Sequence, residues 1–435
     1  MTPPVEEGAL ALEPRAIPNA IPIATPLERI LARGRLRAML AMLGPAFVAA
    51  IAYVDPGNFG TNISAGALFG FLLLWVVLMA NLMAMLVQYL SAKLGIVTDK
   101  NLPELCRERY PRPVTWFLWL QAEGVAMATD IAEFIGAALG LNLLFGVPLV
   151  AAGLITGLIA FALLELQRRG FRRFELAIMG LLGIILLGFV YEMLRITPPT
   201  QALAGFVPHL GSRDAILLAV GIIGATVMPH VIYLHSALTN GRVPARSDAE
   251  RHRILRFERL DVLVALSLAG IVNMAMLAVA ATLFHVPGLP AVTTIQQAHE
   301  GFARLVGGGA ALAFACALLA SGVSSSSVGT YSGQVVMAGF VNLKVSLFLR
   351  RAITMTPAIA LLAWGVDPTR ALVLSQVVLS FGIPFALVPL VLLTSNKQVM
   401  GAFVNGRLAA LAAWSVAGVI VALNAYLLAA QFFGV

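Results

Sequence analysis

The chain has 435 residues, of which 60% are hydrophobic and only 11% charged, and its mean hydropathy is +0.90. Soluble domains are about 45–50% apolar and about 25% charged, so this composition excludes a soluble globular protein and predicts an integral membrane protein in contact with a lipid bilayer. The net charge of +8 does not indicate a nucleic-acid partner, because the basic residues are scattered through short loops and form no continuous stripe.

The N-terminal segment 1–38 precedes the first apolar stretch. Its first 28 residues contain six prolines among residues of mixed polarity, and they lack the uninterrupted apolar core of a cleaved signal peptide. We therefore expect residues 1–38 to form a disordered cytoplasmic tail.

Eleven apolar segments follow this tail. A membrane-spanning helix needs about 20 mostly apolar residues to cross the hydrocarbon layer, and charged or Pro/Gly-rich breaks divide the chain into segments of that order. The predicted spans lie at 39–64, 66–92, 113–142, 147–166, 174–194, 215–238, 259–285, 305–340, 346–365, 370–394 and 408–432. The expected fold is therefore an all-α integral membrane protein with eleven transmembrane helices.

The basic residues predict the orientation of these spans. All of the 29 Lys and Arg residues fall on one side of the membrane, except Arg195, Arg213, Arg304 and Arg370. Because cytoplasmic loops are enriched in Lys and Arg, we expect a cytoplasmic N-terminus. The odd number of spans then places the C-terminus outside, in a multi-pass protein of the plasma or bacterial inner membrane.

Two of the spans are interrupted by helix breakers. Span one carries Asp55-Pro56-Gly57-Asn58, and span six carries Pro229 within GIIGATVMPHVIYLH. Broken helices at corresponding positions of two halves indicate an inverted-repeat transporter with its binding site near the membrane midplane. The expected division is a first repeat at 39–194, an extracellular loop at 195–214, a second repeat at 215–394, and a loop with helix eleven at 395–435.

The side chains beside the two breaks predict a metal site. Asp55 offers a carboxylate, Asn58 an amide oxygen and Met228 a thioether sulfur. Mg²⁺ and Ca²⁺ favour all-oxygen sites, whereas a soft sulfur donor favours transition metals such as Mn²⁺ or Fe²⁺. Two alternatives stay open at this point: Asp55 could serve only as a helix N-cap, and Met228 could serve only to fill the core.

The paired motifs DPGN and MPH resemble the signature of the Nramp family, whose members are proton-coupled transporters of divalent transition metals. The resemblance also covers GPAFVAAIAYVDPGNF, NLPEL at 101–105, QAEGVAMATDIAEFIGAALG at 121–140 and GIIGATVMPHVIYLHSAL, and it extends over essentially the whole chain after the tail. It implies the LeuT-like form of the 5+5 inverted repeat, with an appended helix eleven.

The same resemblance implies a particular ligand set. By it, Asp55, Asn58 and Met228 bind the metal together with the carbonyls of Ala52 and Ala225. Gln376, in SQVVLSFG, resembles the position that joins when the site closes. Family members that carry Mg²⁺ lack the methionine, which favours Mn²⁺ or Fe²⁺ for this chain.

A proton route is expected along span three. Glu123, Asp130 and Glu133 fall on one face of that helix, and three carboxylates are costly in a membrane unless they face protein, water or each other. They could simply pair with Arg350 and Arg351 near the start of span nine.

The functional alternative is a proton relay that connects these acids with Asp55 and His230, and it resembles the family's use of Asp130 and Glu133 as exit-path groups. His230 and His235 are five residues apart and do not share one helix face, so a joint metal site is not expected. His230 is predicted to line the pathway, and His235 to be a hydrogen-bonded packing residue.

The predicted function is import of a divalent metal with a proton by alternating access, without a cofactor and without an obligate protein partner. The alternatives are a Na⁺-coupled amino-acid carrier of the same fold and a passive divalent metal channel. An intramembrane enzyme is disfavoured because the chain has no HExxH motif, and ATP-driven transport is disfavoured because it has no GxxxxGK[ST] loop.

Overall fold

The computed structural model describes residues 25–32, 34–168, 170–209, 211–286, 288, 292–343 and 345–433, and this part of the chain is helical, without strands. Its elements are α1 (Pro26–Leu31), α2 (Arg35–Met42), α3 (Pro45–Ala52), α4 (Pro56–Phe69), α5 (Leu74–Thr98), α6 (Leu102–Arg109), α7 (Arg112–Phe145), α8 (Leu149–Arg168), α9 (Phe171–Arg195), η1 (Thr200–Phe206), α10 (Arg213–Thr226), α11 (Pro229–Thr239), α12 (Asp248–Phe284), α13 (Ile295–Leu305), α14 (Gly308–Val341), α15 (Leu347–Ala363), α16 (Pro368–Thr394), α17 (Lys397–Met400), η2 (Gly401–Phe403) and α18 (Arg407–Phe433).

The predicted spans correspond to helices of this structure. Within the described residues, eight stretches are long and apolar enough to cross a membrane, with α10 and α11 counted as one stretch. The remaining three predicted spans correspond to α8, whose part Leu149–Leu163 is a shorter apolar helix, to the 17-residue α15 and to the α3–α4 pair. Each predicted span therefore coincides with a helix or a helix pair of the structure.

The boundaries of two spans differ from the prediction. The second span was expected at 66–92, but α4 continues to Phe69 and α5 begins only at Leu74. Gly70, with φ of +59°, ends α4 in a conformation that a residue with a side chain seldom adopts. The turn lies inside an apolar run, so hydropathy alone could not place it. Similarly, α12 begins at Asp248, well before the predicted residue 259, because Ser247 caps a charged first turn.

The expectation of a disordered tail is wrong for its last part. Residues 26–31 form α1, which begins with a capping box between Thr25 and Glu28, and Leu27 of this helix is fully buried. Residues 35–42 form α2. Short helices of this kind carry too little hydrophobic periodicity to be predicted. Residues 1–24 lie outside the described part of the chain.

The centre of the molecule is built from small residues on α7 and α14, which share its most extensive helix contact. A Cβ placed on Gly322 would lie 2.6 Å from the backbone nitrogen of Ala137, and one on Gly140 would lie 2.8 Å from the Cα of Leu319. Small residues let helix backbones approach in a membrane. The serine-rich run at 321–330 lies in this contact and supplies small side chains on the α14 side.

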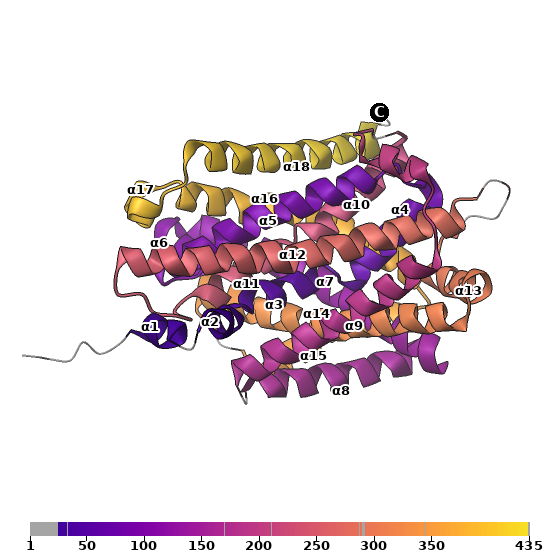
Figure 1. Cartoon of the computed structure of the whole chain (residues 1–435), viewed down its shortest axis with the longest axis horizontal. Helices are drawn as coiled ribbons and strands as arrows, with labels where there is room; N and C mark the ends of the chain where they lie inside the picture. Colours follow the sequence, from indigo (N-terminus) through magenta and orange to yellow (C-terminus); the bar gives the residue numbers. More distant parts are fainter. Residues whose placement is uncertain are drawn as a thin grey trace, which may run out of the picture.

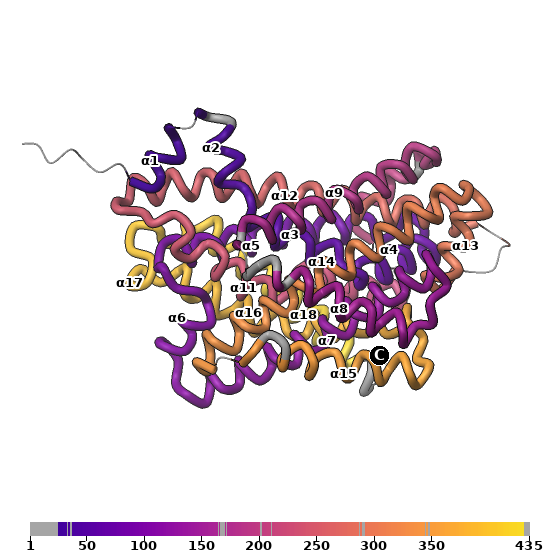
Figure 2. Tube along the Cα trace, turned by 90° about the horizontal axis from the view of Figure 1, so that it is seen from below, coloured from indigo at the N-terminus to yellow at the C-terminus, as the bar shows by residue number. Residues whose placement is uncertain are grey.

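The ends of the helix bundle differ in which segments they carry. Figure 1 shows α1, α6 and α17 at one end and α13 with the end of α18 at the opposite end. In Figure 2, turned by 90°, the same segments again lie at opposite ends. The first and last described helices therefore reach opposite faces of the bundle, as an odd number of spans requires.

Candidate metal centre

At both helix breaks, the helix that follows the break begins with a proline. In the first, α3 ends at Ala52 and α4 begins at Pro56; in the second, α10 ends at Thr226 and α11 begins at Pro229. A helical carbonyl accepts a bond from the N–H four residues later, and proline has no N–H. The residues four before these prolines are Ala52 and Ala225, the two alanines whose carbonyls the family resemblance implied as ligands. The four-residue separation of each alanine from its proline is visible in the sequence and indicates a free carbonyl.

Asp55 and Asn58 form the polar part of the first break. The Asp55 Oδ1 atom accepts hydrogen bonds from the backbone N–H of Asn58 at 2.9 Å and from its side-chain Nδ2 at 2.7 Å. Asp55 is therefore an N-cap, as one alternative predicted, but only one of its oxygens is used. Its Oδ2 atom and the Oδ1 atom of Asn58 are buried, without a hydrogen-bond partner in the described part of the chain. Buried polar atoms are rarely left unpaired, so these two oxygens are available to a ligand.

A hydrogen bond between the two breaks brings them together. The Nδ2 atom of Asn58 donates to the carbonyl of Ala225 at 2.9 Å. Met228 follows Ala225 by three residues, is fully buried, and occupies the N-cap position of α11 without a side-chain cap. The structure thus joins Asp55, Asn58 and the Ala225 carbonyl directly, and it places Met228 in the short unwound segment that follows the last turn of α10.

Gln376 on α16 lies against the first break. A Cβ on Gly57 would overlap the Gln376 side-chain amide and would lie 2.8 Å from the Asp55 Oδ2 atom. The Gln376 amide and the free oxygen of Asp55 therefore converge on the same glycine. The Oε1 atom of Gln376 is buried and has no hydrogen-bond partner among the residues described. Gly57 leaves room for this amide, because a side chain at position 57 would displace it from this place.

Two residues that the sequence analysis did not single out for this role hold the unwound backbone of the first break. Asn273 on α12 donates its Nδ2 hydrogen to the Tyr53 carbonyl at 2.7 Å, and Ser321 on α14 donates to the Val54 carbonyl at 2.5 Å. Both carbonyls lack the helical partners they would otherwise have. Asn273 could have been noticed in the sequence, because it is a single asparagine within an apolar span. Ser321 could not, because it is one of several serines in the same run.

Two of the three acids of α7 face arginines of α15, as the pairing alternative predicted for all three. Arg350 donates two hydrogen bonds to the Glu123 carboxylate, at 2.8 and 3.2 Å. Arg351 lies 3.9 Å from Asp130 and also donates to the Ser326 carbonyl at 3.1 Å. These pairs satisfy charges that would be costly in a membrane.

Among the residues that the structure describes, no arginine lies at hydrogen-bonding distance from Glu133. A Cβ on Gly329 would lie 2.6 Å from the Glu133 Oε2 atom and 3.3 Å from the Asp130 Oδ1 atom, so both carboxylates approach the same point of α14. Both oxygens of Glu133 are without a hydrogen-bond partner in the described residues. One turn further along α7, a Cβ on Gly136 would overlap Pro56. The row of acidic residues on α7 therefore extends toward the first break.

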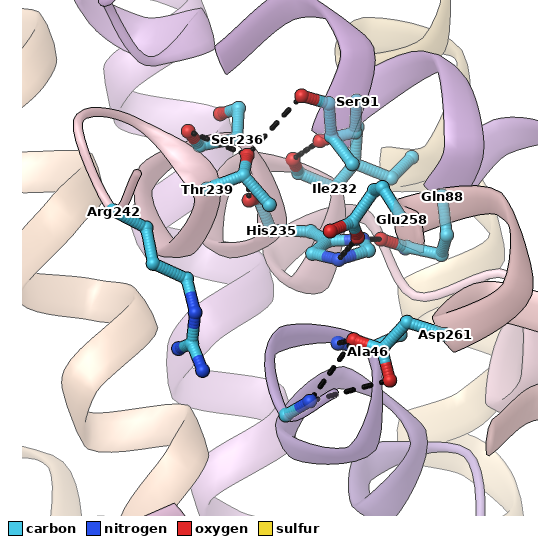
Figure 3. Close-up of polar contacts among 12 residues, drawn as sticks. Ala46, Gln88, Ser91, Ile232, His235, Ser236, Thr239, Arg242, Glu258 and Asp261 are labelled. Carbon is cyan, nitrogen blue, oxygen red and sulfur yellow. Dashed lines mark hydrogen bonds and ion pairs between the residues drawn. The ribbon is translucent and has the colours of Figure 1, made fainter. Parts of the chain in front are cut away.

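The two histidines of α11 have separate surroundings. The Nδ1 atom of His230 lies 3.3 Å from the hydroxyl of Thr129 on α7, and its Nε2 atom is unpaired within the described structure. His235 is bonded through Nδ1 to Gln88 at 2.9 Å and lies 3.0 Å from Glu258 through Nε2. Figure 3 shows this second histidine between its two partners. The expectation of a packing role for His235 agrees with these contacts.

The first turn of α3 is held by a carboxylate of α12. Asp261 accepts from the backbone N–H groups of Gly44 at 3.1 Å and Ala46 at 2.9 Å, as drawn in Figure 3 for Ala46. A carboxylate at a helix N-terminus satisfies orphan donors and complements the helix dipole. Beside it, Arg242 bonds to Glu175 of α9. The first half of the broken span is therefore anchored at its far end as well as at the break.

In the part of the chain that the structure describes, no three His, Cys, Asp or Glu side chains gather as a metal cluster. The candidate centre instead combines one carboxylate with amide, carbonyl and thioether donors at two proline breaks inside an all-helical membrane bundle. The fold and this centre define a multi-pass membrane protein of the LeuT-like class. The fold is shared with Mhp1, a nucleobase-cation-symport-1 family transporter, at a TM-score of 0.56 and 15% identity over 80% of this chain and 77% of that one.

Residues 46–430 match the family model described as "Nramp: Natural resistance-associated macrophage protein-like". The chain belongs to the Nramp family. Both the broken spans and the acids of α7 lie inside the matched region.

Several relatives are similar over nearly their whole length. The "Divalent metal cation transporter MntH" of Bacillus subtilis is 53% identical over 398 residues, covering 91% of this chain and 93% of the relative. The protein of the same name from Deinococcus radiodurans is 52% identical over 394 residues, covering 90% of each. Among solved structures, a manganese transporter of Eremococcus coleocola, in complex with an aromatic bis-isothiourea substituted compound, matches at a TM-score of 0.83 and 34% identity, covering 92% of this chain and 89% of that one.

Proposed function

We propose that this protein imports divalent transition metal ions, Mn²⁺ and Fe²⁺, across the membrane by alternating access, together with protons. The metal would bind between the two breaks, to Asp55, Asn58, Met228, the Ala52 and Ala225 carbonyls and, in the closed site, Gln376.

The observation that carries this proposal is the set of unpaired oxygens at the first break. Asp55 Oδ2, Asn58 Oδ1 and Gln376 Oε1 are all buried without hydrogen-bond partners in the described residues. Leaving buried acceptors unpaired costs about 1–3 kcal/mol each, and a cation would offset that cost at all three. The carbonyls of Ala52 and Ala225 add oxygen donors, because prolines stand where their hydrogen-bond donors would be.

The buried thioether supports a transition metal over Mg²⁺ or Ca²⁺. Met228 has no exposed surface and lies three residues from the Ala225 carbonyl. Alkaline-earth cations take oxygen ligands, whereas sulfur donors favour softer metals. The names of the relatives, divalent metal cation transporters and a manganese transporter, agree with this choice.

The arrangement of acids supports proton coupling. Glu133 and Asp130 approach the same point of α14 at Gly329. Asp130 faces Arg351, and Glu123 pairs with Arg350 nearer the start of α7. A cation arriving beside a carboxylate favours its charged form. Metal binding at Asp55 would therefore displace a proton toward Glu133, with His230 as a further polar group beside the path.

The topology follows the distribution of basic residues. We assign the end of the bundle that carries α1, α6 and α17 to the cytoplasm and the end of α18 to the outside, in a cell membrane. The two inverted repeats would be residues 39–194 and 215–394, linked by 195–214 and followed by 395–435.

Burial of the centre favours alternating access over a passive metal channel. Asp55, Asn58, Met228 and Gln376 are all fully buried, so the ligands face neither aqueous side in this conformation. An amino-acid carrier of the same fold is disfavoured by Asp55, because its carboxylate would repel the carboxylate of the substrate. The thioether would also have no partner in such a site.

The test is Mn²⁺ uptake into proteoliposomes that contain the purified protein, with internal pH recorded simultaneously and excess Ca²⁺ as competitor. We expect uptake together with internal acidification and little inhibition by Ca²⁺. Uptake without proton entry would contradict the symport mechanism and indicate a channel or uniporter. Absence of any metal uptake would contradict the proposal as a whole.

A further inference from the structure

The first turns of α12 extend beyond the membrane-spanning part of that helix. α12 has 37 residues and is therefore about 55 Å long at about 1.5 Å per residue, whereas the hydrocarbon layer is about 30 Å thick. The segment from Leu260 to Phe284 contains a single charged residue, Asp261, and is long enough to cross that layer alone. Figure 1 shows the start of α12 at the end of the bundle that carries α1, α6 and α17.

One face of α12 changes from basic to apolar where the helix enters the hydrocarbon. The exposed side chains of this face, in chain order, are those of Arg253, Arg256, Arg259, Leu260, Leu263, Val264 and Ile271. At about 100° per residue they fall within about 140° of one another. The buried side chains on the opposite face are those of Ile254, Leu255, Glu258, Asp261 and Val262. The three exposed arginines, here called the arginine face, therefore point in the same direction as the side chains that contact lipid tails.

The arginine face lies at the depth of the lipid headgroups. The headgroup region adds about 5–8 Å to the hydrocarbon on each side of the membrane. Arg256 stands about 4.5 Å before Arg259 along the helix axis, and Arg253 stands about 9 Å before it. Because arginine side chains are long and amphipathic, the phosphates of one leaflet come within reach of all three.

Two of these arginines have no carboxylate partner. The ion pairs of this part of α12 belong to Arg251, nearer the start of the helix, and within the described residues none involves Arg256 or Arg259. The Nη2 atom of Arg259 donates to the hydroxyl of Tyr89 on α5 at 3.3 Å, and its Cζ atom lies 5.2 Å from the centre of that ring. Tyrosine is enriched at membrane interfaces, so this contact orients the guanidinium at the headgroup boundary.

We propose that the arginine face binds the headgroup of an anionic phospholipid of the cytoplasmic leaflet, with the phosphate between Arg256 and Arg259. The acyl chains would lie against Leu260, Leu263 and Val264. Guanidinium groups bind phosphate through charge-assisted hydrogen bonds. The occupant is a lipid, rather than a soluble anion or an acidic protein, because the same helix face continues into side chains that contact hydrocarbon. An anionic lipid is favoured over a zwitterionic one, whose own ammonium group the adjacent arginines would repel. The name of the leaflet rests on the topology proposed above.

The bound lipid acts on the segment of α12 that anchors α3. The buried face of these turns carries Asp261, which accepts hydrogen bonds from the N–H groups of Gly44 and Ala46 at the start of α3. It also carries Glu258, which lies 3.0 Å from His235, and Figure 3 shows both acids with these partners. A phospholipid on the opposite face holds this part of α12 at a fixed depth in the membrane and thereby supports the start of the first broken span.

The test is native mass spectrometry of the full-length protein in detergent, with phosphatidylglycerol or phosphatidylcholine added as the probe. We expect phosphatidylglycerol to be retained in preference, and its binding to weaken about fivefold for each arginine removed in Arg256→Gln, in Arg259→Gln and in the double variant. The matched control combines Lys397→Gln with Arg407→Gln, which removes two exposed cations at the same end of the bundle but outside α12. The control should bind phosphatidylglycerol as the wild type does.

A second measurement is thermal unfolding of the same proteins in lipid nanodiscs. Exchange of phosphatidylcholine for phosphatidylglycerol should raise the unfolding midpoint by several degrees in the wild type and in the control. The double variant at Arg256 and Arg259 should show no such rise. An equal rise in this variant would exclude a stabilising role for lipid on the arginine face.

Several results would overturn the proposal. Equal retention of the two lipids by the wild type would exclude a site for anionic lipid. Unchanged binding in the double arginine variant would exclude the arginine face, and an equal loss in the control would mean that only the overall positive charge matters. Displacement of the lipid by millimolar glycerol 3-phosphate would mean that the arginines bind a soluble phosphate. These assays involve neither metal nor proton transport, so their failure is distinct from failure of the proposed import function.

Discussion

Each of the two helix breaks contains a proline, but the protein supports the two breaks differently. At the first break, Asp55 caps α4 and the carbonyls of Tyr53 and Val54 are held by side chains from α12 and α14. At the second break, Met228 occupies the cap position of α11 without a side-chain hydrogen bond. The unwound backbone of the first break is therefore held by neighbouring helices, and this break carries the charged ligand. The second break contributes the polarizable thioether of Met228.

This difference separates two tasks that one metal site must perform. A carboxylate provides attraction for any divalent cation, but it discriminates poorly among them. A thioether adds little attraction for hard cations and favours softer metals. We therefore expect substitutions at the first break to affect whether metal is transported, and substitutions at the second to affect which metal is transported.

The largest effect is expected from removing the charge of the first break. Asp55→Ala should abolish Mn²⁺ uptake into proteoliposomes. Asp55→Asn is the sharper variant, because asparagine is as good an N-cap as aspartate and keeps the start of α4 intact. Uptake at the wild-type rate in the asparagine variant would show that Asp55 acts only as a cap.

Restoring a backbone N–H at either break should have the next largest effect. In Pro56→Ala and Pro229→Ala the new N–H can bond to the Ala52 or Ala225 carbonyl and compete with the metal. We expect Mn²⁺ binding, measured by isothermal titration calorimetry, to weaken about tenfold, which corresponds to about 1.4 kcal/mol. Pro368→Ala is the matched control, since Pro368 is the first residue of α16, where an N–H has no intrahelical acceptor. Equal binding by all three variants would exclude the two carbonyls as ligands.

Neutralising an acid of α7 should change coupling more than binding. Asp130→Asn keeps the shape of the side chain but removes the charge that faces Arg351. We expect Mn²⁺ uptake to lose most of its acceleration at acidic external pH, while Mn²⁺ affinity changes little. The pH profile of uptake measures this effect. A profile parallel to that of the wild type would contradict the proposed relay.

The smallest change in Mn²⁺ uptake is expected at the second break. Met228→Ala should retain part of the uptake but admit Ca²⁺ and Mg²⁺ as competitors, because the remaining ligands are all oxygens. Competition assays with excess Ca²⁺ compare this variant with Met276→Ala, which truncates a buried methionine of α12 outside the centre. If both variants discriminate against Ca²⁺ as the wild type does, the thioether does not determine selectivity.

Most of the fold was predictable because its signals are local. Apolar length predicted a segment for each long helix of the bundle, and Pro229 together with the pair of Pro56 and Gly57 located the two breaks. Turns within continuous apolar runs were not predictable, as the shift of α5 shows, because hydropathy is uniform across Gly70. The α1 and α2 helices were missed because their stability depends on contacts such as the burial of Leu27.

The candidate centre was predictable in part for a different reason. The residues at the breaks were predictable from the sequence, because a carboxylate or a proline is unusual inside an apolar span. The contribution of Asn273 and Ser321 comes from distant helices and depends on three-dimensional contact. Arg350 and Glu123, which pair with each other, are 227 residues apart in sequence. Their pairing could be predicted only because both charges lie in membrane-spanning segments, where each requires a partner.

The close approach of Gln376 to Gly57 has a consequence for inherited variation. Every single-nucleotide missense change of a glycine codon introduces a side chain, and at this position each would occupy the space of the Gln376 amide. Such alleles would retain every metal ligand and an intact membrane topology. In the resulting protein the Gln376 amide would be displaced from its place beside Asp55, and a survey based on substitutions of ligand residues alone would overlook the change.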